Sequence, residues 1–200
     1  MDASKRFNPE NTLNLKRLCF GEYFSLPSPP RDNEEKTSME LELLESIGIN
    51  FKDEDKQTIK KYENCIDVYY NILDQFSLKY DKVEMEELLE DITKIVLYEK
   101  YKHKRTPPIN NARKQKFNIS EEFISEKYPS YPSMCATESM FFSLYFSDRF
   151  PIYKELFMET SRNASNSRLI SSNNYPTDIL AGQTLSHLLY NKYKESIDAR

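Results

Sequence analysis

The sequence predicts an all-α protein built as a single-domain helical bundle. Apolar residues recur at helical spacing over several long stretches, and no stretch shows the sustained alternation of a β-strand. Only 3 glycines occur in 200 residues, too few for the many tight turns of a β-sandwich or for a glycine-rich phosphate loop. The content of 14 Tyr and 12 Phe also excludes a disordered chain, because such chains are poor in aromatic residues.

The first half of the domain is predicted to contain three helices. Residues 34–47 carry an amphipathic pattern, and Gly48 is expected to cap that helix. Residues 54–78 place apolar side chains at alternating steps of three and four, which predicts one bundle helix, with a dimeric coiled coil as the alternative. Residues 83–103 have acidic first turns and basic last turns, as the helix dipole favours, and a pair of prolines follows.

The second half continues the helical pattern. Helices are predicted at 120–127, 134–147 and 151–162, and a last one at 176–194, which has a proline at its first position. The run 100–116 holds seven Lys or Arg and no acid. It is interpreted as a solvated helix end and loop, with an anion site or a nucleic-acid contact as the alternatives.

The first 33 residues differ from the helical domain, which spans residues 34–200. Prolines 27, 29 and 30 exclude a helix there, so the segment is expected to lie as an extended arm over the domain. Its apolar side chains are expected to pack on the domain: Leu18, Phe20, Tyr23, Phe24 and Leu26.

Charge and cysteine usage limit the function classes. The net charge of -4 argues against a general nucleic-acid binder. No apolar run approaches the roughly 18 residues of a membrane span, and no hydrophobic signal core begins the chain, which favours a cytoplasmic location. Cys19, Cys65 and Cys135 are too few and too widely spaced for a disulfide framework or a zinc site. No metal and no cofactor is therefore expected.

Three clusters along the chain carry a resemblance to a known family. They read KYKHKRTPP at 100–108, YPSYPSMC at 128–135 and SRLISSNNYPTDILAG at 167–182. In order and spacing they resemble the motifs KX6RP, PSGH and SRX5HX3D of the type 2 phosphatidic acid phosphatase superfamily, which includes the class A bacterial acid phosphatases and the vanadium haloperoxidases. FSLPSPP at 24–30 resembles the proline-rich arm of the class A enzymes, so the resemblance covers roughly 24–195.

The resemblance implies a helical fold of the acid phosphatase and haloperoxidase type and a phosphate site. In the family, Lys, Arg and backbone N–H groups hold the phosphate, one histidine attacks phosphorus and a second protonates the leaving oxygen. Lys100, Ser133 and Arg168 match phosphate-binding positions, and Asp178 matches the aspartate that orients the nucleophile.

Four positions depart from the family pattern. The arginine of the first motif falls on Pro107, and the glycine of the second motif on Met134. The acid histidine falls on Cys135 and the nucleophilic histidine on Asn174. Because an amide nitrogen has no available lone pair, no phospho-enzyme can form at Asn174 by the family's route.

The two histidines of the chain do not fill this gap. His103 is expected to sit at a helix end, and His187 to pack between helices. The hypothesis is a pseudophosphatase that acts by binding or assembly, through a protein partner or further copies of itself, with weak phosphate or other oxyanion binding at most. The alternatives are an active phosphomonoester hydrolase that uses Cys135, and a structural subunit of a larger assembly such as a virus particle.

Overall fold

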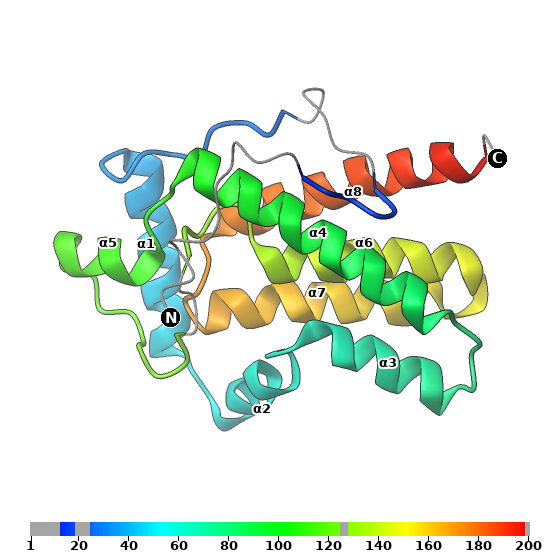
Figure 1. Ribbon diagram of the computed structural model, residues 1–200. Coiled ribbons are helices and arrows are strands. Elements are labelled where there is room, and N and C mark those ends of the chain that lie inside the picture. Colours follow the sequence, from blue (N-terminus) through cyan, green and yellow to red (C-terminus); the bar gives the residue numbers. More distant parts are fainter. Residues whose placement is uncertain (1–12, 19–24, 125–127, 199–200) are drawn as a thin grey trace, which may run out of the picture.

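A computed structural model describes residues 13–18, 25–124 and 128–198 of the chain (Figure 1). Within these ranges the regular structure is entirely helical, which confirms the all-α class. No helix of the described ranges is long and apolar enough to cross a membrane.

The helices follow one another along the chain with short connections. In order they are α1 (Glu35–Ile49), α2 (Asp53–Lys61), α3 (Cys65–Gln75), α4 (Lys82–His103), α5 (Pro108–Gln115), α6 (Met134–Arg149), a 3-10 turn (Pro151–Tyr153), α7 (Lys154–Ile170) and α8 (Pro176–Asp198).

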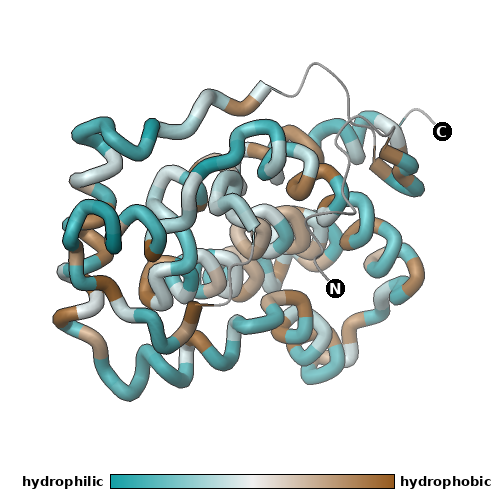
Figure 2. Tube along the Cα trace, turned by 60° about the vertical axis from the view of Figure 1, so that its left-hand side comes forward, coloured by the Kyte–Doolittle hydropathy of each residue, from teal (hydrophilic) through white to brown (hydrophobic). Residues whose placement is uncertain are grey.

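Helix α6 is the centre of the bundle. It packs along its length against α7 on one side and α8 on the other, and α3 and α4 also contact it (Figure 1). Helices α1 and α5 pack together at one end of the bundle. Hydrophobic and hydrophilic residues alternate along the helices (Figure 2), as expected where each helix buries one face and exposes the other.

Two hydrophobic cores hold this arrangement together. In the main core, the rings of Tyr69, Phe146 and Phe157 lie with their centroids 5.5–6.3 Å apart and join α3, α6 and α7. A smaller core packs α1 and α5 against the start of α8 through Leu41, Leu44, Ile109, Ala112, Ile119 and Tyr175.

The single helix predicted over 54–78 is wrong. Helix α2 ends at Lys61 and α3 begins at Cys65, so the chain turns a corner in the middle of the apolar pattern. Ile59 and Ile66 are buried on either side of the corner. From Tyr62 to Leu73 the apolar residues of the pattern pack into the main core, so the pattern does not form a coiled-coil surface.

Other predicted boundaries also change. Gly48 lies inside α1, and Asn50 is the residue that caps it. Residues 120–124 form a turn where a helix was predicted, and the remainder of that prediction, 125–127, lies outside the described residues. Helix α4 ends where Lys104 adopts a left-handed conformation with φ of 52°.

Helix α5 was missed because its prolines were interpreted only as a stop signal. Pro108 occupies the first position of α5, where the missing N–H is no loss. The interpretation of 100–116 as solvated is also wrong for two of its seven basic residues, because Lys100 and Arg105 are buried. Arg113 and Lys114 of α5 are exposed.

The two histidines differ from each other in their surroundings. His103 lies at the end of α4, as expected, with Nε2 3.1 Å from a Glu99 oxygen and its ring edge-on to Tyr131. His187 is exposed on α8. The expectation that His187 packs between helices is wrong.

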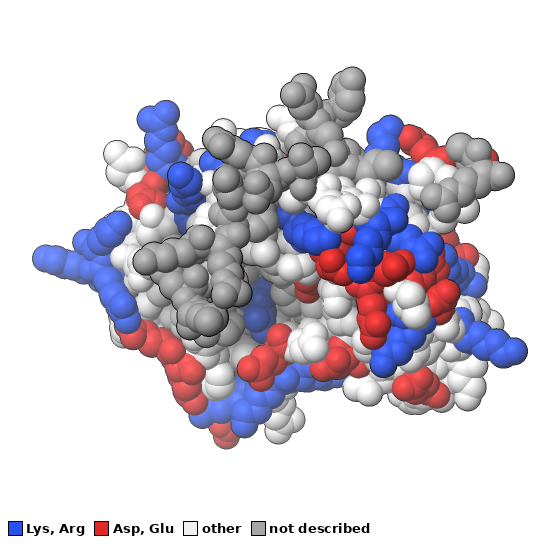
Figure 3. All heavy atoms as spheres, viewed as in Figure 1, with Lys and Arg blue, Asp and Glu red and all other residues white. Residues whose placement is uncertain are grey.

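A carboxylate of α4 anchors the N-terminal arm. The buried Asp91 accepts hydrogen bonds at 2.6–2.9 Å from three consecutive backbone N–H groups, those of Lys16, Arg17 and Leu18. Lys16 and Arg17 also form surface ion pairs with acids of α4, each at 2.7 Å. Figure 3 shows acidic and basic side chains gathered on this face.

Apolar contacts complete the attachment of the arm. Leu18 and Leu26 are both buried in the main core, as expected for an arm that packs on the domain. Phe20, Tyr23 and Phe24, named with them, lie outside the described residues.

Replacing Asp91 should loosen the arm and destabilise the fold. Asp91→Ala leaves three backbone N–H groups without their acceptor, and we expect a loss of about 2–4 kcal/mol in the free energy of unfolding. Urea unfolding measures it. The matched control is Glu90→Ala, the neighbouring acid, whose ion pairs are exposed and which should cost much less. Equal losses in the two variants would contradict the anchoring role.

Candidate functional site

The candidate site forms where the end of α4, the start of α6 and the loop before α8 meet. Lys100 of α4 is fully buried, and its Nζ donates to the carbonyl oxygens of Pro129 at 2.6 Å and Ser130 at 3.1 Å. The side-chain nitrogen of Asn174 donates to the same Ser130 oxygen at 2.9 Å. One backbone carbonyl therefore joins the predicted lysine to the residue at the nucleophile position.

Ser133 links this group to α8. It caps the start of α6, and its Oγ donates to Oδ1 of Asn174 at 3.0 Å. Its backbone N–H donates to the carbonyl of Asp178 at 2.9 Å. Both polar ends of the Asn174 amide are thus used inside the protein.

Gly182 permits this close contact between α6 and α8. A Cβ atom at Gly182 would lie 2.6 Å from the Ser133 carbonyl oxygen and 3.0 Å from Oγ1 of Thr137. The 2.6 Å distance to a backbone oxygen cannot accommodate a side chain without movement of the backbone. The glycine that closes the third cluster therefore has a direct packing role.

Arg105 is a member of the site that the sequence reasoning missed. Its Nη1 donates to Asp178 at 2.7 Å and to Thr177 at 2.6 Å, and its Nη2 donates to Glu40 at 2.6 Å. The guanidinium also lies 3.9 Å from the centre of the Tyr175 ring. Burial alone would lower the pKa of Arg105, but the two carboxylates outweigh burial and raise it.

Asp178 therefore has a different partner from the one the resemblance implied. One carboxylate oxygen accepts from Arg105 and the other from the backbone N–H of Tyr175 at 2.9 Å. Asn174 binds Ser130 and Ser133 instead. The aspartate positions an arginine and the start of α8, and the expected pairing with residue 174 is absent from the described contacts.

Arg168 points away from this cluster. Its Nη2 donates to the carbonyl of Tyr62 at 3.3 Å, and its Nε to Oγ of Ser167 at 3.2 Å. The side chain lines a surface hollow of about 270 Å³ next to α2 and residues 122–124. The backbone carbonyl of Arg168 nevertheless accepts from the N–H groups of Asn173 and Asn174, which shapes the loop.

Cys135 lies beside a second cysteine. Its Sγ is 3.7 Å from the Ala164 carbonyl oxygen. Sγ of Cys65, at the start of α3, lies 3.8 Å from the Cys135 carbonyl and 3.7 Å from Oε2 of Glu138. Hydrogen bonding to the Cys135 thiol, together with burial, raises the pKa of Cys65 well above its usual value.

Glu138 is the acidic member of this second group. Its Oε1 accepts from Oγ1 of Thr93 at 3.3 Å. Burial of the carboxyl raises its pKa to about 7, although hydrogen bonds from Thr93 and Cys65 and the charge of Lys100 act in the opposite direction. Neither Cys65 nor Glu138 had been assigned to the site, because no local sequence pattern connects them to residue 135.

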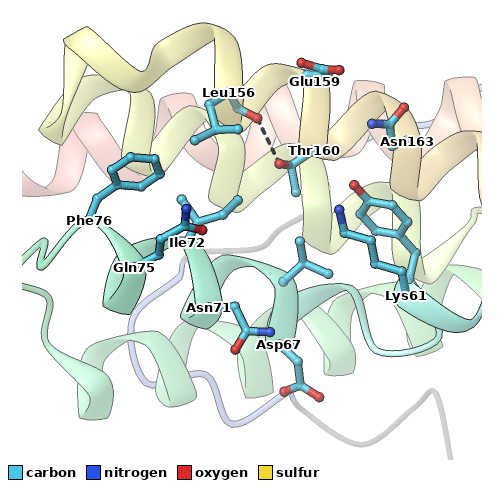
Figure 4. A pocket seen from close by; sticks show the side chains of 12 residues that line it. Lys61, Asp67, Asn71, Ile72, Gln75, Phe76, Leu156, Glu159, Thr160 and Asn163 are labelled. Atoms are coloured by element: carbon cyan, nitrogen blue, oxygen red, sulfur yellow. Dashed lines mark hydrogen bonds between the residues drawn. The ribbon is translucent and has the colours of Figure 1, made fainter. Parts of the chain in front are cut away.

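A larger hollow lies elsewhere, between α3 and α7, with a volume of about 510 Å³. Figure 4 shows Lys61, Asp67 and Asn71 on one wall and Glu159 and Asn163 on the other. None of the predicted site residues lines it.

The described residues contain no group of three or more His, Cys, Asp or Glu side chains that could hold a metal ion.

Comparison with known proteins adds no assignment: no protein-family model matches the chain, and no curated protein matches it significantly.

Removing the Arg105 side chain should destabilise the fold strongly. Arg105→Met leaves the carboxylates of Glu40 and Asp178 buried without their cation, and we expect a loss of about 3–5 kcal/mol in the free energy of unfolding at neutral pH. Urea unfolding measures it. Arg113→Met is the control, because the Arg113–Glu121 pair is exposed and should contribute little. A similar, small effect of both substitutions would contradict the structural role of Arg105.

Glu138 should make stability depend on pH. The pKa of its carboxyl is about 7 in the folded protein and 4.5 ordinarily, so folding favours the protonated form. This contribution is present below about pH 4.5 and is lost as the pH rises through about 7. The free energy of unfolding of Glu138→Gln, taken relative to that of the parent, should therefore increase by about 1–3 kcal/mol as the pH is raised from about 5 to about 8. Denaturant unfolding at both pH values tests this, and a difference that does not change with pH would contradict it.

Proposed function

We propose that the chain is a catalytically inactive relative of the type 2 phosphatidic acid phosphatase superfamily, with that fold, and that it acts by binding a protein partner or by assembling with further copies. The observation that carries the proposal is the hydrogen bonding of the Asn174 side chain. At the position that the resemblance gives to the nucleophile there is an amide whose oxygen and nitrogen both bond within the protein.

The two buried cations of the site are also occupied by groups of the protein. Lys100 donates to two backbone carbonyls, and Arg105 is neutralised by Glu40 and Asp178. A phosphate would have to displace these partners and would gain little net charge attraction. Each lost bidentate contact weakens binding by roughly 10- to 100-fold, so we expect phosphate affinity in the millimolar range at most.

The alternative function is an active phosphomonoester hydrolase that uses the Cys135 thiolate. The thiol is partly exposed, which favours reactivity. However, its described contacts are the Ala164 carbonyl and Cys65, and neither would hold a phosphate beside it. Cys135 also lies at the position of the proton donor in the resemblance, on the leaving-group side of phosphorus.

Exposed apolar side chains supply surfaces for a binding or assembly role. Met39 and Leu43 lie one turn apart on α1, and Leu180 and Leu188 lie on one side of α8. The same surfaces would serve a structural subunit of a larger assembly. A cytoplasmic location agrees with either role.

Purified protein should not hydrolyse an aryl phosphate above the background rate. The reason is the loss of both histidines of the family's mechanism, at Asn174 and Cys135. The assay compares the parent protein with Cys135→Ala over a range of pH. Turnover near ~1 per second, an ordinary value for enzymes, that disappears in Cys135→Ala would overturn the proposal in favour of the hydrolase.

Calorimetry with phosphate and with vanadate completes the test. Binding weaker than about 1 mM supports the proposal. Micromolar binding that is lost in Lys100→Ala or Arg168→Ala would assign an oxyanion ligand to the site and overturn it. The mass in solution, measured over a range of protein concentrations, then distinguishes self-assembly from a monomer that requires a partner.

A further inference from the structure

The two described cysteines lie at the starts of neighbouring helices. Cys65 is the first residue of α3, and Cys135 lies in the first turn of α6. They are 70 residues apart in sequence, yet Sγ of Cys65 is 3.8 Å from the Cys135 backbone. We propose that Cys65 and Cys135 are a redox-modified pair that forms a reversible disulfide in the folded protein, with hydrogen peroxide as the oxidant.

Helix position and neighbouring groups both bear on how the two thiols lose their protons. The first turn of a helix favours negative charge, and each cysteine lies in such a turn. The hydrogen bond to the Cys135 thiol and burial raise the pKa of Cys65 well above its usual value, and the positive charge of Arg168 opposes them only in part, so Cys65 needs a proton acceptor in order to react. The carboxyl of Glu138, 3.7 Å from Sγ of Cys65, is placed to accept the proton of that thiol.

The two thiols differ in access, which assigns their roles. Cys135 is partly exposed, whereas Cys65 is only 3% exposed. A small oxidant therefore reaches Cys135 first, and Cys65 is the thiol that resolves the oxidised intermediate. This division of roles is the one expected for a redox-sensitive pair.

The reaction balances with one molecule of peroxide. The Cys135 sulfur attacks one peroxide oxygen and the O–O bond breaks; the products are a sulfenic acid and, after the thiol proton is taken up, one water. The Cys65 sulfur then attacks the Cys135 sulfur, the S–S bond forms and the S–O bond breaks. Glu138 accepts the Cys65 proton and passes it to the departing hydroxide, which leaves as a second water. The two sulfurs together lose two electrons, and two molecules of a thiol such as glutathione return them and are left joined as a disulfide.

The disulfide would tie α3 to α6 and close a long loop of the chain. Such a link restricts the unfolded chain more than the folded one. Oxidation should therefore raise the midpoint of thermal unfolding, and reduction should reverse the rise.

The experiment uses full-length protein with Cys19→Ser, because residue 19 lies outside the described residues. Under native conditions peroxide should lower the intact mass by about 2 Da, the loss of two hydrogen atoms. Peptide mapping should identify a Cys65–Cys135 cross-link, and dithiothreitol should restore the mass. In a Cys65→Ser variant the same treatment should add about 16 or 32 Da at Cys135 instead.

A matched variant and a denatured control make the test decisive. Glu138→Gln should keep the cross-link but slow its formation several-fold, because the proton acceptor is lost. Protein in denaturant should cross-link more slowly than folded protein. Oxygen addition without a cross-link in the parent, or equal rates in folded and denatured protein, would overturn the proposal. Mapping of the unsubstituted chain, where the same pair should form, guards against an effect of the Cys19 substitution.

Discussion

The contact between the starts of α6 and α8 is the constraint on which the site depends. The Ser133 N–H bonds to the Asp178 carbonyl at 2.9 Å, and the glycine one turn further along α8 allows the two backbones to approach. Because this contact sets where α8 begins, it also sets the loop before it, and with that loop the Asn174 amide. The first turn of α8 in turn carries the carboxylate that holds Arg105.

The interior of the site is polar but internally balanced. Two cations, Lys100 and Arg105, and two carboxylates, Glu40 and Asp178, are all buried. A catalytic phosphate site instead keeps positive charge available for its ligand. Here the side-chain nitrogens of Lys100 and Asn174 and both terminal nitrogens of Arg105 donate to a carbonyl, a hydroxyl or a carboxylate of the protein, whereas the buried Nε of Arg105 has no hydrogen-bond partner. These polar groups specify how the helices join.

Much of the fold could be predicted because helix periodicity and end signals are local. Helices α4, α6 and α8 begin within a residue of the predicted positions. The corner between α2 and α3 was not predictable from the pattern, since the apolar spacing continues through Tyr62, and α5 was missed because prolines both end and begin helices.

The candidate site was also predictable only in part. The resemblance predicted one site from Lys100, Ser133, Cys135, Arg168, Asn174 and Asp178. Hydrogen bonds, in part through the Ser130 carbonyl, connect Lys100, Ser133, Asn174 and Asp178, whereas Arg168 and Cys135 have other partners. Glu40 contacts Arg105 across 65 positions, and the pair formed by Cys65 and Glu138 spans 73. Such contacts are created by helix packing, and no local spacing records them.

The residues that anchor the arm at Asp91 should differ in how well they tolerate substitution. The arm contributes backbone N–H groups, which every amino acid except proline possesses. Positions 16 and 17 are therefore open to wide substitution in a library of variants, provided proline is avoided, whereas the acceptor on α4 has few replacements. Tolerance to mutation should thus be broad at positions 16 and 17 and narrow at Asp91, the helix position that accepts their hydrogen bonds.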